Sequence, residues 1–278
     1  IGDGDVVVVP PITFVASANA ALYCGADVAF VDVEPDTGLI SSDALAEFLR
    51  LDPRRDKVRA VVAVHYAGLP CDIANLAALC DQNGIALIED ACHAPGATWT
   101  DASGTVHRIG DGSVSAFTAL SFHPVKHVTT GEGGALLTND AALAERAAMF
   151  RSHGVTRRNE LLQDHDGPWY YEQQILGFNY RMPDVLAALG TSQLTKHSRW
   201  LQRRREVAHV YREQFKGLPS IELQGERDGR THAYHLFPVL VQNRAIVFDK
   251  LLERGIRPQV HYIPVHRQPY YRAKYGKV

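Results

Sequence analysis

Short, almost wholly apolar segments recur through the first ninety residues, and each is followed by a stretch of helical composition. The segments are shorter than buried helices and rich in valine and isoleucine, which favours strands that are covered on both faces. We expect these strands at Val6–Val9, Val28–Val33, Ala60–Val64 and Ile85–Ile88. Strands of this kind with helices between them predict a parallel sheet in a layered α/β domain.

Helices are expected where a capping residue or an N-terminal proline precedes a stretch of helical composition. They are 17–23, 42–49, 72–83, 141–150, 183–197 and 199–215. Two more strands are expected at Ser113–Phe117 and Ala135–Thr138. Residues 151–181 are polar and irregular, and a loop of that length is usually functional or mobile.

The pattern changes after Pro219. A strand at His235–Val241, a helix at Ala245–Glu253 and a strand at Gly255–Val260 predict a small α+β domain. We therefore divide the chain into a large domain, residues 1–197, and a small C-terminal domain, residues 198–278.

Composition excludes several classes of protein. Among the 278 residues, 46% are hydrophobic and 22% are charged, which excludes disorder, collagen and coiled coil for the whole chain. A net charge of −2 disfavours a general nucleic-acid binder, because neutralising phosphates needs a basic surface. No apolar run reaches the length of about 18 residues that predicts a membrane-spanning helix. The four cysteines form no CxxC motif and indicate reduced thiols in a cytoplasmic protein.

A candidate site lies where the strand at 85–88 ends. Asp90 follows this strand, and folds of this kind bind ligands at the carboxyl ends of parallel strands. Taken alone, such an aspartate is more often a helix cap or a satisfied buried acid. Lys126 follows a later strand, with Ser121 five residues before it, although a lone lysine is most often a solvated surface amine.

Together these residues suit the chemistry of pyridoxal 5'-phosphate. This cofactor needs a lysine for its aldehyde, a carboxylate against its pyridinium nitrogen, and hydroxyl and N–H donors for its phosphate. Lys126, Asp90 and Ser121 provide these groups. Phe14 and His93 are the candidates to cover the faces of the ring, although a phenylalanine alone is more often part of a core.

Five segments of the chain resemble the DegT/DnrJ/EryC1/StrS family, in the family's order. They are Thr13–Ala20, Glu89–Ala97, Ser121–Lys126, Gly131–Gly134 and Gly177–Arg181. The family comprises sugar aminotransferases of fold type I, which implies a mostly parallel seven-stranded-type sheet between helices and a small C-terminal α+β domain. Residues 121–126, 150–154 and 169–172 most resemble the pseudaminic acid branch of the family.

The resemblance implies roles for residues at the cofactor. Lys126 would hold the cofactor and move a proton during amino transfer, and Asp90 would pair with the pyridinium nitrogen. His93 would lie near the ring hydroxyl. Phe14 would stack on the ring, and Ser121 would hold the phosphate.

Substrate and partner roles follow from two other segments. Asn179, with Arg181 beside it, would reach the phosphate region of the neighbouring subunit's site, which makes a homodimer necessary for function. The segment that would line the nucleotide-sugar pocket comprises His261, Tyr262, Ile263, Pro264 and His266. No metal site is expected. The rings of His261 and His266 should point in different directions, and no third metal ligand accompanies them.

The pseudaminic acid branch aminates carbon 4 of a UDP-linked 4-keto-6-deoxy-N-acetylhexosamine and takes the amino group from glutamate. Amination of another keto-sugar, at carbon 3 or 4 on a dTDP or GDP carrier, is an open alternative. So is a regulator or an inactive cofactor-binding fragment. Relatives that dehydrate the sugar carry histidine in place of the lysine, and Lys126 argues against that reaction.

The ends of the chain also differ from those of the family. The chain opens with Ile1, after the family's segment with the Ser/Gly-Thr phosphate-binding turn, and it stops soon after His266, inside the small domain. We therefore expect a chain that is truncated at both ends and lacks part of the phosphate cradle and one strand of the sheet.

Overall fold

The centre of the structure is a six-stranded sheet. The computed structural model describes residues 1–276, and in this part of the chain the strand order is β2-β1-β3-β4-β7-β8. These strands are β1 (Val6–Val9), β2 (Asp27–Phe30), β3 (Val58–Val64), β4 (Ala86–Asp90), β7 (Phe117–Ser121) and β8 (Gly134–Leu137). All are parallel except β8, which pairs antiparallel with β7. The expected α/β class with a mostly parallel sheet is confirmed.

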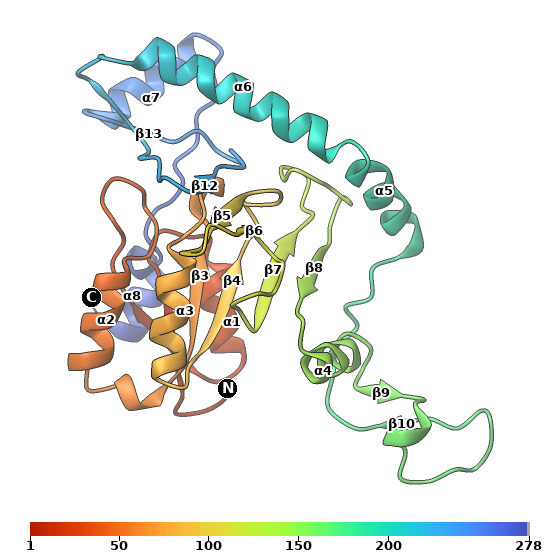
Figure 1. Cartoon of the computed structure of the whole chain (residues 1–278). Helices are drawn as coiled ribbons and strands as arrows, with labels where there is room; N and C mark the ends of the chain where they lie inside the picture. Colours follow the sequence, from red (N-terminus) through yellow and green to blue (C-terminus); the bar gives the residue numbers. More distant parts are fainter. Residues whose placement is uncertain (277–278) are drawn as a thin grey trace.

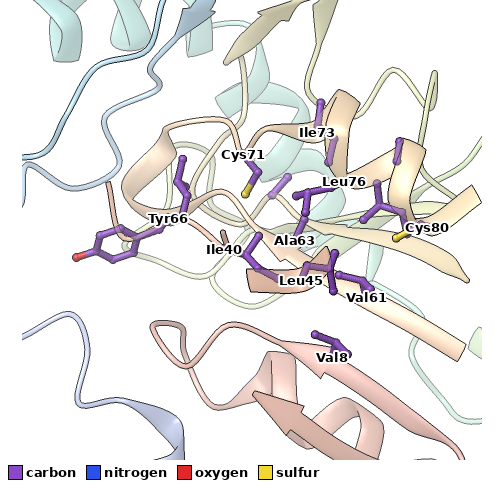
Figure 2. Packing of buried hydrophobic residues seen from close by; sticks show 14 of the residues in the cluster. Val8, Ile40, Leu45, Val61, Ala63, Tyr66, Cys71, Ile73, Leu76 and Cys80 are labelled. Carbon is purple, nitrogen blue, oxygen red and sulfur yellow. The ribbon is translucent and has the colours of Figure 1, made fainter. Parts of the chain in front are cut away.

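Helices cover both faces of this sheet (Figure 1). They are α1 (Ala16–Tyr23), α2 (Ser42–Leu51), α3 (Ile73–Gln82) and α8 (Pro269–Tyr275). On one face, Leu45 of α2 and Leu76 of α3 pack with Val8 in a buried cluster (Figure 2). On the other face, Ala18 of α1 and Tyr271 of α8 belong to a second cluster. Since both faces are covered, the strands are apolar throughout rather than alternating.

The remaining elements surround the sheet. The helices are α4 (Ala141–Arg151), α5 (Asp184–Leu194), α6 (His197–Phe215) and α7 (Arg244–Glu253). The short strands are β5 (Thr98–Thr100), β6 (Val106–Arg108), β9 (Val155–Thr156), β10 (Glu172–Gln173), β11 (Ile221–Leu223), β12 (Arg230–Thr231) and β13 (Val239–Val241). The segment with β9 and β10 projects away from the sheet, and α5 and α6 lead back over it (Figure 1). Within residues 1–276, every helix is too short or too polar to cross a membrane.

Three expected strands differ most from the structure, and a fourth, Val28–Val33, ends already at Phe30. The strand expected at Ser113–Phe117 begins only at Phe117, because the amide of Ser113 donates to the Asp111 carboxylate (2.9 Å) in a local turn. The strand expected at His235–Val241 is reduced to β13. Tyr234 has a φ of 49°, and the amide of Leu236 donates to the carbonyl of Ala67 (3.2 Å) instead of to a strand.

The third expected strand, Gly255–Val260, does not form. Ile256 and Val260 are exposed, and no strand in residues 1–276 pairs with this segment. Sequence reasoning also missed β5, β6 and β12, which form a separate three-stranded sheet. These strands are two or three residues long, too short to show a periodicity.

The end of the chain returns to the large sheet. Val265 lies in the same buried cluster as Tyr271, and its amide donates to the carbonyl of Pro11 (2.9 Å). Tyr271 packs edge-on against Phe30 of β2, with ring centroids 5.8 Å apart. The last part of residues 198–278 thus packs on residues 1–197, and the division into two domains at that boundary stays a prediction.

A buried carboxylate links three strands of the sheet. Glu89 of β4 is 3% exposed, and it accepts hydrogen bonds from His65 Nε2 (2.9 Å), Ser115 (2.5 Å) and Thr118 (3.1 Å). The amide of Cys71 donates to His65 Nδ1 (3.0 Å), so the imidazole proton lies on Nε2 and points at Glu89. Burial alone would raise the pKa of Glu89, but these three donors outweigh it and lower the pKa.

Replacing Glu89 with glutamine should destabilise the fold at neutral pH. We expect E89Q to reduce the free energy of unfolding by about 1.5–3 kcal/mol, since hydrogen bonds to a charged acceptor are lost. Because the folded-state pKa is lowered, this stabilisation is present above the unfolded-state pKa of about 4.3 and is lost as the pH falls further. Urea denaturation at several pH values measures the difference.

The matched control is E47Q, which changes an exposed glutamate of α2. We expect its stability to equal that of the wild type at every pH. Equal stability of E89Q and the wild type at neutral pH would contradict the role of the buried carboxylate.

Candidate active site

Three of the expected site residues lie at the carboxyl ends of neighbouring parallel strands. Asp90 is the last residue of β4, and Ser121 is the last residue of β7. Asp90 is in register with Ala119, so Ser121 extends just beyond it at the same edge. Lys126 lies on the loop that connects β7 to β8. The strand order therefore brings together residues that are far apart in the sequence.

The carboxylate of Asp90 is held at both oxygens. Ser17 donates to Oδ2 (2.6 Å), and the amide of Cys92 donates to Oδ1 (3.2 Å). Ser17 lies in the first turn of α1, on the helix that covers this part of the sheet. These contacts orient the carboxylate before any ligand binds.

Lys126 is half-buried at this edge. Burial lowers the pKa of its amine, and the nearby Cys92 and Asp90 oppose this only in part. A lowered pKa increases the neutral fraction of the amine, which is the nucleophilic and proton-accepting form.

His93 is buried three residues after Asp90. Its Nε2 lies 3.1 Å from the hydroxyl of Tyr262, and its Nδ1 has no hydrogen-bond partner among residues 1–276. Its ring lies 4.4 Å from that of His235, measured between centroids. Burial and the neighbouring Lys126 lower the pKa of His93 to about 3, so the imidazole is neutral at physiological pH.

The C-terminal segment reaches the same site. The hydroxyl of Tyr66 donates to the carbonyl of His261 (2.5 Å). This hydrogen bond fixes the backbone directly before Tyr262. Ile263 is 56% exposed, and His266 packs edge-on against Phe30. The structure thus brings Tyr262 to the candidate site, with His261 beside it and Ile263 facing solvent.

Phe14 and Ser121 have groups that are free to meet a ligand. The ring of Phe14 is 61% exposed, and the adjacent Thr13 bonds to Ser17, the residue that donates to Asp90. The hydroxyl of Ser121 accepts the amide of His123 (3.3 Å). Its own proton has no acceptor in the described part of the chain.

Asn179 and Arg181 are placed differently. Both are exposed, and Asn179 forms a β-bridge with Ser152 in the segment that projects from the sheet. Within residues 1–276, no hydrogen bond or ion pair connects either side chain to Asp90 or Lys126. Asn179 therefore lies on the projecting segment, and neither side chain has such a bond to the candidate site in the described part of the chain.

Sequence reasoning missed several residues that complete the site. Thr13, Ser17 and Cys92 all hold Asp90, directly or through one hydroxyl, and His235 packs on His93. The only available signal was that two hydroxyl residues, Thr13 and Ser17, stand close together around the start of a predicted helix. Nothing in the sequence indicated that His235 would reach His93 from so far along the chain.

The whole chain, residues 1–278, matches the family described as the DegT/DnrJ/EryC1/StrS aminotransferase family. It is 33% identical to the UDP-4-amino-4,6-dideoxy-N-acetyl-beta-L-altrosamine transaminase of Campylobacter jejuni. That match covers 98% of this chain and 69% of the relative.

Solved structures show the same fold. PseC of Helicobacter pylori, an aminotransferase involved in the biosynthesis of pseudoaminic acid, superposes with a TM-score of 0.87 at 30% identity, over 100% of this chain and 71% of that one. The PLP form of Spr1654 from Streptococcus pneumoniae superposes with a TM-score of 0.84 at 26% identity, over 99% and 71%. The chain therefore belongs to the DegT/DnrJ/EryC1/StrS aminotransferase family, and it is a sugar aminotransferase.

Proposed function

We propose that this protein transfers the amino group of glutamate to carbon 4 of a UDP-linked 4-keto-6-deoxy-N-acetylhexosamine, for the synthesis of nonulosonic (pseudaminic) acid or a surface glycan. The observation that carries the proposal is the half-buried Lys126 at the sheet edge where Asp90 is held at both oxygens. The names of the similar proteins from C. jejuni and H. pylori support this class of substrate.

Pyridoxal 5'-phosphate fits the groups at this edge. Asp90 offers an oriented carboxylate to the pyridinium nitrogen, and His93 has a buried Nδ1 without a partner in residues 1–276, suited to the ring hydroxyl. Ser121 has a hydroxyl proton for the phosphate, and Phe14 has an exposed ring that can stack on the cofactor. When bound, the cofactor supplies an aldehyde that links to amines and a ring that withdraws electrons. The PLP form of Spr1654 supports this assignment.

Lys126 has two tasks in this proposal. Its amine would hold the cofactor through the aldehyde in the resting enzyme. When that amine is free, it would take the proton from the α-carbon of glutamate. In the second half of the reaction, Lys126 would return a proton to carbon 4 of the sugar. Because burial lowers the pKa of this lysine, it can accept a proton near neutral pH.

The exposed segment between residues 169 and 185 supports a homodimer. Six of its large side chains are more than half exposed: Trp169, Tyr171, Leu176, Phe178, Tyr180 and Val185. A second copy of the chain would cover these side chains. Asn179 and Arg181 of one subunit would then reach the active site of the other.

The nucleotide-sugar would lie along the segment of His261, Ile263, Pro264 and His266, beside Tyr262.

The four cysteines are free thiols, which supports a cytoplasmic location. They are Cys24, Cys71, Cys80 and Cys92.

Loss of the Lys126 amine should abolish amino transfer. We expect the turnover of K126A to fall by at least about 100-fold, the scale of a lost general acid–base group. Borohydride reduction followed by mass spectrometry should place the cofactor on the peptide with Lys126 in the wild type. The exposed K250A on α7 is the control and should behave like the wild type. Full turnover by K126A would rule out the assignment.

Product analysis distinguishes the candidate substrates. With purified protein, cofactor and glutamate, we expect UDP-linked 4-keto-6-deoxy-N-acetylhexosamine to gain one amino group at carbon 4, with release of 2-oxoglutarate. Nuclear magnetic resonance of the product identifies the carbon. Parallel reactions with dTDP- and GDP-linked keto-sugars test the alternative, and preferred turnover of one of them would replace the proposed substrate.

Mixed dimers test whether Asn179 acts across the interface. N179A and K126A should each be inactive alone. An equimolar mixture of refolded chains should recover about a quarter of wild-type activity, because half of the dimers are mixed and each has one intact site. No recovery, in mixtures shown to contain mixed dimers, would place Asn179 in the site of its own chain.

A further inference from the structure

Two hydroxyl groups form a chain that ends on Asp90. The hydroxyls of Thr13 and Ser17 lie 2.8 Å apart, and Ser17 lies 2.6 Å from Asp90 Oδ2. Thr13 is 2% exposed and Ser17 is 9% exposed. Water therefore does not compete for these hydrogen bonds.

The direction of the chain follows from the number of protons. An ionised carboxylate only accepts, so the single proton of Ser17 is donated to Asp90. The oxygen of Ser17 then accepts from Thr13, whose hydroxyl proton points the same way. Hydrogen bonds in such a row polarise one another, which strengthens the last one.

Helix capping does not explain these hydroxyls. The N-cap of α1 is Val15, and no side chain caps this helix end. Thr13 lies two residues before the N-cap, and its hydroxyl reaches that of Ser17 in the first turn of the helix. The amide of Ser17 donates to the carbonyl of Phe14 (3.3 Å). This hydrogen bond fixes Phe14, whose ring is exposed, next to the first turn of α1.

We propose that Ser17 is a positioning residue for the aminotransferase reaction, and that Thr13 orients it. This inference rests on the proposed function, in which Asp90 meets the pyridinium nitrogen. Ser17 holds Oδ2 and the Cys92 amide holds Oδ1, so the carboxylate has one orientation and keeps free lone pairs for the ring. A charge-assisted O–H···O⁻ bond is stronger than a bond between neutral groups, so Ser17 holds this orientation of Asp90 toward the ring nitrogen firmly.

The chain offers a matched control for the loss of a serine hydroxyl. Ser42 is the first residue of α2, and its buried hydroxyl has no hydrogen-bond partner among residues 1–276. S42A and S17A therefore both remove a hydroxyl from the first turn of a helix, but only S17A removes a contact to Asp90.

The experiment titrates wild type, S17A, S17T, T13V and S42A with pyridoxal phosphate labelled with ¹⁵N in the ring. We expect S17A to bind about 10- to 100-fold more weakly, the scale of one lost hydrogen bond to a charged group. Its ring-nitrogen resonance should move toward the unprotonated position. S17T, which keeps the hydroxyl, should restore both values, and S42A should match the wild type.

T13V separates positioning from folding, since it leaves Ser17 in place. We expect its ring-nitrogen resonance to move in the same direction as that of S17A but by less, and the double variant to match S17A alone. If S17A does not fold, T13V carries the test.

Wild-type affinity and an unmoved resonance in S17A, or in T13V where S17A does not fold, would overturn the inference while leaving the proposed function intact. A wild-type chain that binds no pyridoxal phosphate would overturn both.

Discussion

The buried carboxylate of Glu89 is the interaction on which the site geometry depends. It lies in β4 and accepts hydrogen bonds from His65, the residue that follows β3, and from Thr118 in β7. Since successive residues of a strand point to opposite faces, fixing Glu89 on one side also fixes Asp90 on the other. A buried charge is tolerated only when its hydrogen bonds are satisfied, and three donors meet that condition here.

The other side of β4 presents the carboxylate of Asp90 to Lys126 and to buried imidazoles. Around Lys126 the imidazoles are neutral, because burial lowers the pKa of His93 to about 3 and that of His127 to about 4. Burial also lowers the pKa of Lys126 itself. Asp90 is the carboxylate that opposes these shifts, through its charge beside His93 and Lys126. The site thus combines one oriented anion with groups that burial keeps uncharged, which suits a cationic ring and an amine that must exchange protons.

Much of this arrangement could be predicted from short sequence segments. The apolar strands β1, β3 and β4 were expected within two residues, because both of their faces are buried and their composition reflects it. Asp90 and Lys126 were recognised by their places after strands. Elements that depend on distant partners were not predictable: β5 exists because it pairs with β6 and β12, and His235 leaves its expected strand because Leu236 bonds to Ala67.

By itself the sequence determined the layered α/β fold, its family and the residues suited to the cofactor, since these depend on local composition and on motifs of a few residues. Only the tertiary structure decided how the residues are held. It placed Ser17 on Asp90 and Tyr262 on His93, contacts that join positions 73 and 169 residues apart. It also packed α8 against β2 and left the segment around Asn179 exposed. The physical reason is that a motif specifies which chemical groups are present, whereas the order of strands in the sheet decides which of them meet.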